Sequence, residues 1–258
     1  MIWVLHICFN RAARIGRAVR VSKRSALFAA PFLLAVCASA GAVSGNVELV
    51  SAHDSNARKH ADNSGVVVWL EPLSGAPVVP ASVVRAQMVQ KNKTFSPHVL
   101  AITVGTVVDF PNFDPIFHNA FSNYNGQIFD IGLYPPGTTR SLGFHREGVV
   151  RVFCNIHPTM SAVIVVLKSQ YFGTSAKNGE FEIGHVPAGS YRLHVFHERA
   201  DEQTLAALTR TIEVADGTAD PLSLQISENG YLELPHKNKF GKDYPPAADA
   251  SGYAGAKP

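Results

Sequence analysis

The chain has 258 residues, of which 46% are hydrophobic and 17% are charged, so it can bury a core and is not wholly disordered. Six of its 23 Lys and Arg residues lie within positions 1–40, which contain no Asp or Glu, and residues 41–258 therefore carry 17 basic against 20 acidic side chains. A net charge of −3 over that part of the chain gives no electrostatic basis for binding DNA or RNA.

Residues 1–40 have the layout of a secretory signal peptide. A basic stretch ending at Lys23 and Arg24 precedes an apolar run over 25–36, and residues 38–40 are small, as a cleavage site requires. The apolar run is shorter than the ~20 residues that a membrane span needs. The sequence therefore predicts export to the periplasm with no membrane span after signal cleavage, and an uncleaved anchor is the alternative.

Cysteine usage points to a metal. Cys8 and Cys37 fall within the predicted signal, so the exported chain would keep Cys154 alone. One cysteine cannot form an internal disulfide, and a lone thiol in an oxidising compartment is a liability unless something binds it. We expect that a metal ion does.

Beyond the signal, the periodic segments are typical of β-strands. The clearest runs are residues 66–70, 83–89, 99–104, 107–110, 149–153 and 162–167. Asn178-Gly179 is a strong hairpin signal, and apolar and polar residues alternate after it, as far as Val195. Residues 205–208 fit either one helical turn or a strand. The sequence predicts an all-β fold made of two β-sandwiches.

The predicted strands and turns divide the chain into five parts. A signal peptide covers 1–40, the first sandwich 79–168 and the second sandwich 169–227. Residues 41–78 form a β segment of uncertain assignment, which either adds edge strands to the first sandwich or belongs to the second. From residue 229 onward Pro, Gly, Ala, Lys and Asp dominate, so we expect 228–258 to be a flexible tail without a core.

The residues that carry chemistry lie in the first sandwich. Cys154, His157 and Met160 form a Cys-x-x-His-x-x-Met motif between two predicted strands, and His118 lies 36 residues before the cysteine. Two imidazoles and a thiolate with a weak thioether are the donor set of a mononuclear blue-copper site. Thiolate and thioether stabilise Cu(I), whereas imidazole suits both oxidation states.

The segment from about residue 83 to 168 resembles a cupredoxin, the plastocyanin-like family of small blue-copper proteins with a Greek-key β-sandwich. The matching pieces are 95–97 before a strand, 104–105 before 107–110, His118-Asn119 and the Cys154/His157/Met160 loop. The short loop, with Pro158 after the histidine, is most similar to that of amicyanin.

This resemblance implies one mononuclear type 1 copper site, with His118, Cys154, His157 and Met160 as the metal ligands. It also implies that Asn119 ties the two ligand-bearing loops together through hydrogen bonds.

Residues 171–227 resemble the carboxypeptidase regulatory-like β-sandwich, a small immunoglobulin- or transthyretin-like unit. Segments 178–181 and 186–191 carry its usual turn–strand pattern. Together the two sandwiches resemble exported proteins described as methylamine-utilisation-like, from which no methylamine pathway follows.

The remaining candidates have simpler interpretations. His194 and His197 are three apart on a predicted strand and so point to opposite faces, which favours ordinary surface roles. Asp114, before Pro115, is typical of a turn residue, and nothing in the sequence marks a substrate pocket or catalytic residues.

Two functions remain open. The first is a soluble one-electron carrier that exchanges electrons with protein donors and acceptors through the exposed edge of His157. An apolar docking patch would surround that edge, formed by Pro115, Ile116, Phe117 and Pro158. The second is a non-redox copper-binding or delivery module whose second sandwich docks on a partner. A copper oxidase is disfavoured because the chain has no His-x-His pair for additional copper ligands.

Overall fold

The computed structural model of the chain describes residues 41–50, 62–74, 84–123, 126–215, 220–230 and 236–244. Within those ranges it consists of strands joined by turns, with one short helix, α1 (Glu202–Leu208), so the predicted all-β fold is confirmed. The predicted signal peptide lies outside the described residues. No helix in the described part of the chain is both long and apolar enough to cross a membrane.

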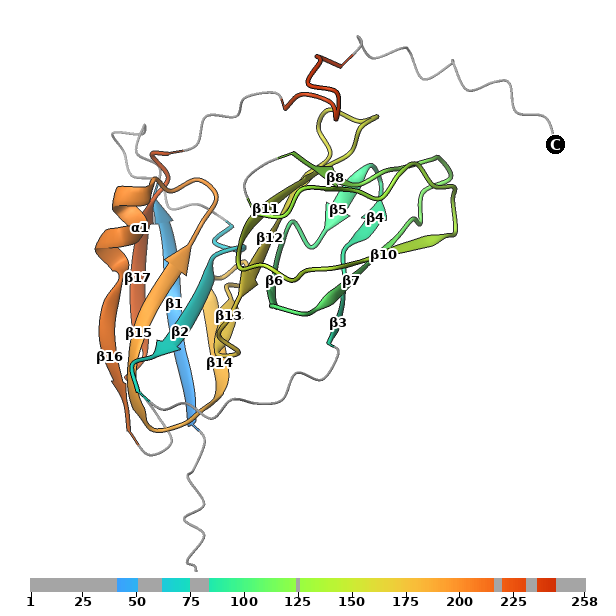
Figure 1. Cartoon of the computed structure of the whole chain (residues 1–258). Helices are drawn as coiled ribbons and strands as arrows, with labels where there is room; N and C mark the ends of the chain where they lie inside the picture. Colours follow the sequence, from blue (N-terminus) through green and yellow to red (C-terminus); the bar gives the residue numbers. More distant parts are fainter. Residues whose placement is uncertain are drawn as a thin grey trace, which may run out of the picture. The chain divides into compact units, whose positions relative to one another are not determined.

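Residues 85–167 form the first sandwich (Figure 1). One sheet has the order β6 (Val99–Thr103), β12 (Ser161–Leu167), β11 (Gly148–Phe153), β8 (Phe121–Ser122) and β9 (Phe129–Asp130). The other has the order β10 (Thr139–Gly143), β7 (Val107–Pro111) and β3 (Arg85–Gln87), and β4 (Val89–Lys91) pairs with β5 (Thr94–Ser96). The predicted strand over 83–89 is thus broken at Met88, whose amide instead donates to the Asp109 carbonyl.

Strand β12 explains why its sequence is apolar without interruption. Side chains of a strand alternate between two faces, and both faces of β12 are buried. Ala162, Ile164 and Val166 enter the core of the first sandwich, together with Cys154 and Met160. The other face packs in a separate apolar cluster that includes Val67 of β2 (Val67–Pro72).

The second sandwich is discontinuous in sequence. One sheet has the order β14 (Glu180–Val186), β1 (Gly41–Val50) and β17 (Leu222–Ser227). The other has the order β13 (Phe172–Thr174), β2, β15 (Gly189–Phe196) and β16 (Arg210–Val214). The segment of uncertain assignment therefore supplies β1 and β2 to this sandwich, and residues 85–167 are inserted between β2 and β13.

The turn predicted at Asn178-Gly179 forms, but the hairpin does not. Gly179 adopts a positive φ of 86°, and its carbonyl accepts a hydrogen bond of 2.9 Å from Val47 N in β1. The strands on its two sides, β13 and β14, belong to different sheets. The prediction of a hairpin was wrong because a tight turn is equally able to carry the chain from one sheet to the other.

Candidate metal centre

Three donor atoms meet at one end of the first sandwich. His118 lies between β7 and β8, Cys154 directly follows β11, and His157 lies in the loop between β11 and β12. Cys154 Sγ lies 3.9 Å from His118 Nδ1 and 3.6 Å from His157 Nδ1. Among the described residues, these form the one group of three or more His, Cys, Asp or Glu arranged to hold a metal ion.

The spacing of the donor atoms fits a shared metal ion. Metal–nitrogen bonds of about 2.0 Å and metal–thiolate bonds of about 2.3 Å that meet at about 110–120° separate their donor atoms by about 3.5–3.7 Å. The two sulfur–nitrogen distances fall close to that interval. His118 and Cys154 are fully buried, whereas His157 is partly exposed.

The ligand loop is closed by its own backbone. Cys154 N donates to the Met160 carbonyl, and Met160 N donates to the His157 carbonyl, both at 3.1 Å. Met160 is fully buried in the core cluster that contains Cys154. The role of its sulfur as an axial ligand remains a prediction.

Asp114 orients His118, a role that the sequence did not reveal. His118 Nε2 donates to Asp114 Oδ2 at 2.7 Å, which fixes the ring so that Nδ1 faces the cysteine. The same carboxylate accepts the backbone N–H groups of Asn92 and Lys93, two turn residues with φ of 56°. Asp114 is therefore more than the turn residue that the sequence predicts. A carboxylate four residues before a candidate histidine ligand is the signal that could have shown it.

Electrostatics prepare the thiol for a metal. Burial opposes ionisation of Cys154, but hydrogen bonds from His118 and His157 outweigh it and lower the pKa of the thiol to about 6. Burial likewise opposes a charge on His118, yet its contacts with Cys154 and Asp114 raise its pKa. The chain therefore stabilises a thiolate beside two imidazoles, which is the state that binds a soft metal ion.

Asn119 connects the two ligand-bearing loops. Asn155 N, next to the cysteine, donates to Asn119 Oδ1 at 3.0 Å, and Asn119 Nδ2 donates to Asp130 Oδ1 at 2.7 Å. The residue after His118 is thereby joined to the residue after Cys154.

Residues 236–244 differ from the predicted flexible tail, because they pack against this centre. Tyr244 Oη donates to the Cys154 carbonyl oxygen at 2.6 Å. The signal for a tail was composition, which does not report an individual tyrosine that finds a partner about ninety residues earlier in the chain.

The exposed edge of the centre is apolar. Phe113, Phe117 and Leu133 are 63%, 45% and 56% exposed, and Pro115, between the two phenylalanines, and Pro158, after His157, are also exposed. Phe117 precedes His118, and Leu133 precedes Tyr134, whose backbone pairs with His118. Of the predicted docking patch, Pro115, Phe117 and Pro158 are exposed and Ile116 is partly exposed, and its position around His157 stays a prediction.

Comparison with known proteins returned solved structures only. No family model and no curated protein matches the chain. A purple cupredoxin from Nitrosopumilus maritimus is 30% identical over 32% of this chain and 99% of its own, with a TM-score of 0.29. A copper-containing nitrite reductase from Thermus scotoductus is 27% identical over 38% of this chain and 26% of its own, with a TM-score of 0.32. A Cu(I) amicyanin variant is 19% identical over 32% of this chain and 82% of its own, with a TM-score of 0.31. The neighbours are cupredoxins. They match about a third of the chain.

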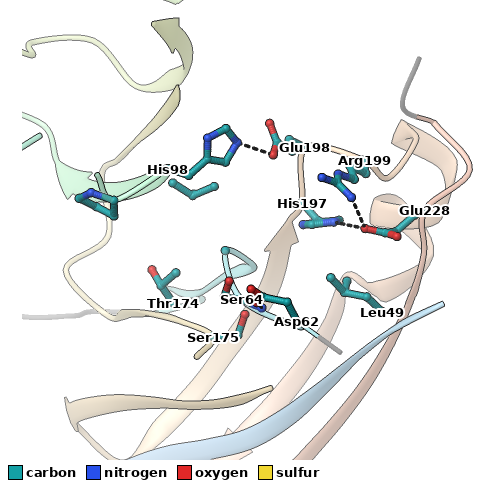
Figure 2. A pocket seen from close by; sticks show the side chains of 13 residues that line it. Leu49, Asp62, Ser64, His98, Thr174, Ser175, His197, Glu198, Arg199 and Glu228 are labelled. Atoms are coloured by element: carbon teal, nitrogen blue, oxygen red, sulfur yellow. Dashed lines mark hydrogen bonds and ion pairs between the residues drawn. The ribbon is translucent and has the colours of Figure 1, made fainter. Parts of the chain in front are cut away.

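Two histidines outside the metal centre, His98 and His197, line a separate hollow of about 420 Å³ (Figure 2). His98 Nε2 lies 2.6 Å from Glu198 Oε1, and His197 Nε2 lies 3.1 Å from Glu228 Oε1. His197 is 5% exposed, so the surface role predicted for it was wrong, because it continues the buried face of β15 on which Tyr191, Leu193 and Val195 lie. His194 stacks on Trp69 with ring centroids 5.0 Å apart.

Proposed function

We propose that this protein is a type 1 copper protein that carries single electrons. His118, Cys154 and His157 would hold the ion, and Met160 would be a weak axial ligand. When bound, copper supplies a one-electron couple between its +1 and +2 states. The layout of residues 1–40 supports export to the periplasm.

The observation that carries this proposal is the convergence of the three donor atoms in the metal-free chain. Two of the donors are fully buried, and hydrogen bonds hold their loops. A donor set that is already in place changes little when the charge of the ion changes by one. A small rearrangement means a low barrier for electron transfer.

The donor types favour copper over other ions. Thiolate and imidazole also bind zinc, but zinc sites complete their shell with a further cysteine, histidine, carboxylate or water. Here the residue that closes the loop is Met160, and a thioether is a soft donor suited to Cu(I). No carboxylate joins the three donors within the described residues, since Asp114 faces the far nitrogen of His118.

The accessible side of the centre suggests where electrons enter and leave. His157 is the one partly exposed member of the three donors, and exposed apolar residues adjoin two of the donors in sequence, Phe117 before His118 and Pro158 after His157. An apolar surface of this kind desolvates readily against a protein partner. We propose that a protein donor and a protein acceptor dock there in turn, and that the protein itself catalyses no reaction.

The test is metal analysis and a visible spectrum of the protein after expression with its own N-terminal segment. We expect one copper per chain and an intense thiolate-to-Cu(II) band that bleaches with a mild reductant. The Cys154→Ser variant is the control, since it removes the thiolate and should be colourless. A colourless copper-bound wild type would favour a delivery module, and a Cys154→Ser protein that kept the colour would refute the site.

A further inference from the structure

Residues 236–244, far from the proposed ligands in sequence, contact the ligand loop at Cys154. Tyr244 is half-buried, and its hydroxyl lies 2.6 Å from the Cys154 carbonyl oxygen and 3.2 Å from His236 Nδ1. The His236 ring in turn packs on Phe153, with ring centroids 4.1 Å apart. Residues 236–244, drawn in red in Figure 1, are thus anchored on both Cys154 and the residue before it.

A second set of contacts closes a ring of four hydrogen bonds. Lys239 N donates to Asn155 Oδ1 at 3.0 Å, and Asn155 N donates to Asn119 Oδ1 at 3.0 Å. Asn119 Nδ2 donates to Asp130 Oδ1, and Lys239 Nζ returns to Asp130 Oδ2, both at 2.7 Å. Every member uses a different atom for each bond, so no partner competes with another.

The ring joins the residues that follow two of the donors. Asn119 follows His118, and Asn155 follows Cys154. Without Lys239, the bonds from Asn155 to Asn119 and from Asn119 to Asp130 would remain, but the Asn155 side chain would lose its partner and the ring would be open. Because the contacts come from backbone as well as side-chain atoms, the position of the whole segment is defined, and not only that of one flexible lysine.

We propose that residues 236–244 form a strap that belongs to the metal centre, with Tyr244 and Lys239 as positioning residues for Cys154 and His118. This inference rests on the proposed copper site for its effect on the metal, but the strap itself is a property of the metal-free chain. It assigns a function to a segment outside both sandwiches.

The strap has a defined electrostatic effect. The Tyr244 O–H bond points its positive end at the Cys154 carbonyl, two bonds from the carbon that carries the sulfur. A positive dipole end close to the ion favours the less charged state, Cu(I), and so raises the reduction potential. Loss of this hydrogen bond should lower the potential, whereas a purely structural contact would leave it unchanged.

The first test replaces Tyr244 by Phe in the full chain. We expect amide hydrogen exchange in residues 154–160 of the metal-free protein to accelerate roughly three- to tenfold, the range for one net hydrogen bond. The reduction potential of the copper-loaded variant should shift downward. Tyr191→Phe is the matched control, because Tyr191 donates in the same way to the Pro187 carbonyl, at 2.8 Å, within the second sandwich. That control should change neither quantity.

The second test replaces Lys239 by Met and uses Lys237→Met as its control. Both variants lose one positive charge from the same segment, but Lys237 pairs only loosely with Asp243, at 3.7 Å. We expect faster exchange around residues 119 and 155 for Lys239→Met alone, and a larger fall in potential than the control shows.

Two results would overturn the strap. Wild-type exchange and potential in both Tyr244→Phe and Lys239→Met would show that the segment does not position the centre. Faster amide exchange with reduction potentials equal to those of the controls would show that residues 236–244 stabilise the loop without affecting the metal. If the chain binds no copper, the proposed function fails, but the exchange measurement on the metal-free protein still decides whether the strap holds the loop.

Discussion

At the scale of single residues, the centre depends on groups that direct the donors as much as on the donors themselves. Asp114 accepts a hydrogen bond from His118 Nε2 and thereby orients the ring so that Nδ1 faces the thiolate. The two imidazoles in turn hold Cys154 as a thiolate against the penalty of burial. Each group thus influences the protonation state of the next. The effects of Cys154, Met160 and Asp114 on the metal centre can each be tested.

The Cys154 thiol should titrate near pH 6 in the metal-free protein, well below the ~8.5 of an ordinary cysteine. Thiolate absorbance in the ultraviolet, followed against pH, measures it directly, and Cys154→Ser provides the blank. A metal must displace the thiol proton below this pKa, so metal affinity should fall as the pH drops below about 6. A titration midpoint near 8.5 would contradict the hydrogen bonds described at the sulfur.

Met160→Gln should bind copper with a lower reduction potential. An axial thioether stabilises the reduced state, whereas a harder amide oxygen favours Cu(II). Voltammetry of the loaded protein is the measurement. Complete loss of copper would make Met160 a main ligand or an essential core residue, and an unchanged potential would mean that its sulfur does not face the ion.

Asp114→Asn should weaken copper binding by about ten- to a hundredfold, the usual effect of losing a group that orients a metal ligand. The amide keeps the size of the side chain but removes the charge that holds the Nε2 proton. Asp109→Asn is the control, because Asp109 is also bonded on the first sandwich, to Arg85 and Ser141, away from the donors. Equal affinities in a competition titration with a Cu(I) chelator would argue against the role of Asp114.

At the scale of elements, the sequence identified strands wherever burial imposes a pattern. The apolar runs at β11 and β12 are long and bounded by polar loops, and both form. The short strands β8 and β9 have two residues each, too few for any period to show. Their existence depends on pairing across the sheet, as between Phe121 and Phe153, which no local pattern reports.

Gly179→Ala should destabilise the second sandwich by at least about 2 kcal/mol. Position 179 needs a positive φ of 86°, and an added Cβ would lie 2.2 Å from the Val47 carbonyl oxygen in β1. Gly184→Ala on β14 is the matched control, since an added Cβ there meets nothing within 4 Å, and it should stay within about 0.5 kcal/mol. Denaturant unfolding compares the two, and equal stabilities would show that the turn yields without cost.

At the scale of the whole molecule, the set of donor residues was predictable from the sequence, but the residues that hydrogen-bond to the donor-bearing loops were not. Soft donors at fixed spacing, with Cys154 the one cysteine after residue 40, predict a metal site from the sequence alone, and the structure brings three of these donors together. The partners of those donors come from distant segments: Asp130 and Tyr244 reach the centre through folding, at positions that no local motif marks. The assignment of β1 had the same difficulty, because its partner β17 lies about 180 residues later.

The contact between His98 and Glu198 should make stability depend on pH. The hydrogen bond that His98 donates to Glu198 raises the pKa of His98, and it lowers the pKa of Glu198 against the effect of burial. The raised pKa means that His98 stabilises the fold below about pH 6.5, its unfolded value, and that this contribution is lost as the pH rises through the folded value. Glu198 adds its part above about pH 4.3.

We therefore expect His98→Gln to destabilise the protein more at pH 5.5 than at pH 8.5, by amounts that the partial exposure of His98 keeps small. His145→Gln, at an exposed histidine, is the control and should show no such difference. Denaturant unfolding at the two pH values is the measurement. If His98→Gln lowered the free energy of unfolding equally at both pH values, a charge on His98 would contribute nothing to the stability of the fold.

The insertion of one sandwich between β2 and β13 of the other sets an order of assembly. Residues 85–167 are contiguous, so all three metal donors can come together as soon as that length of chain is available. The outer sandwich must wait for residue 227, because β1 is completed by β17, and contacts between distant segments form slowly. A chain emerging from its N-terminus would gather its donors first, close the outer sandwich second and secure the ligand loop last. The interval before Tyr244 arrives is when the donors are held least firmly, and metal delivered then would meet the most accessible form of the site.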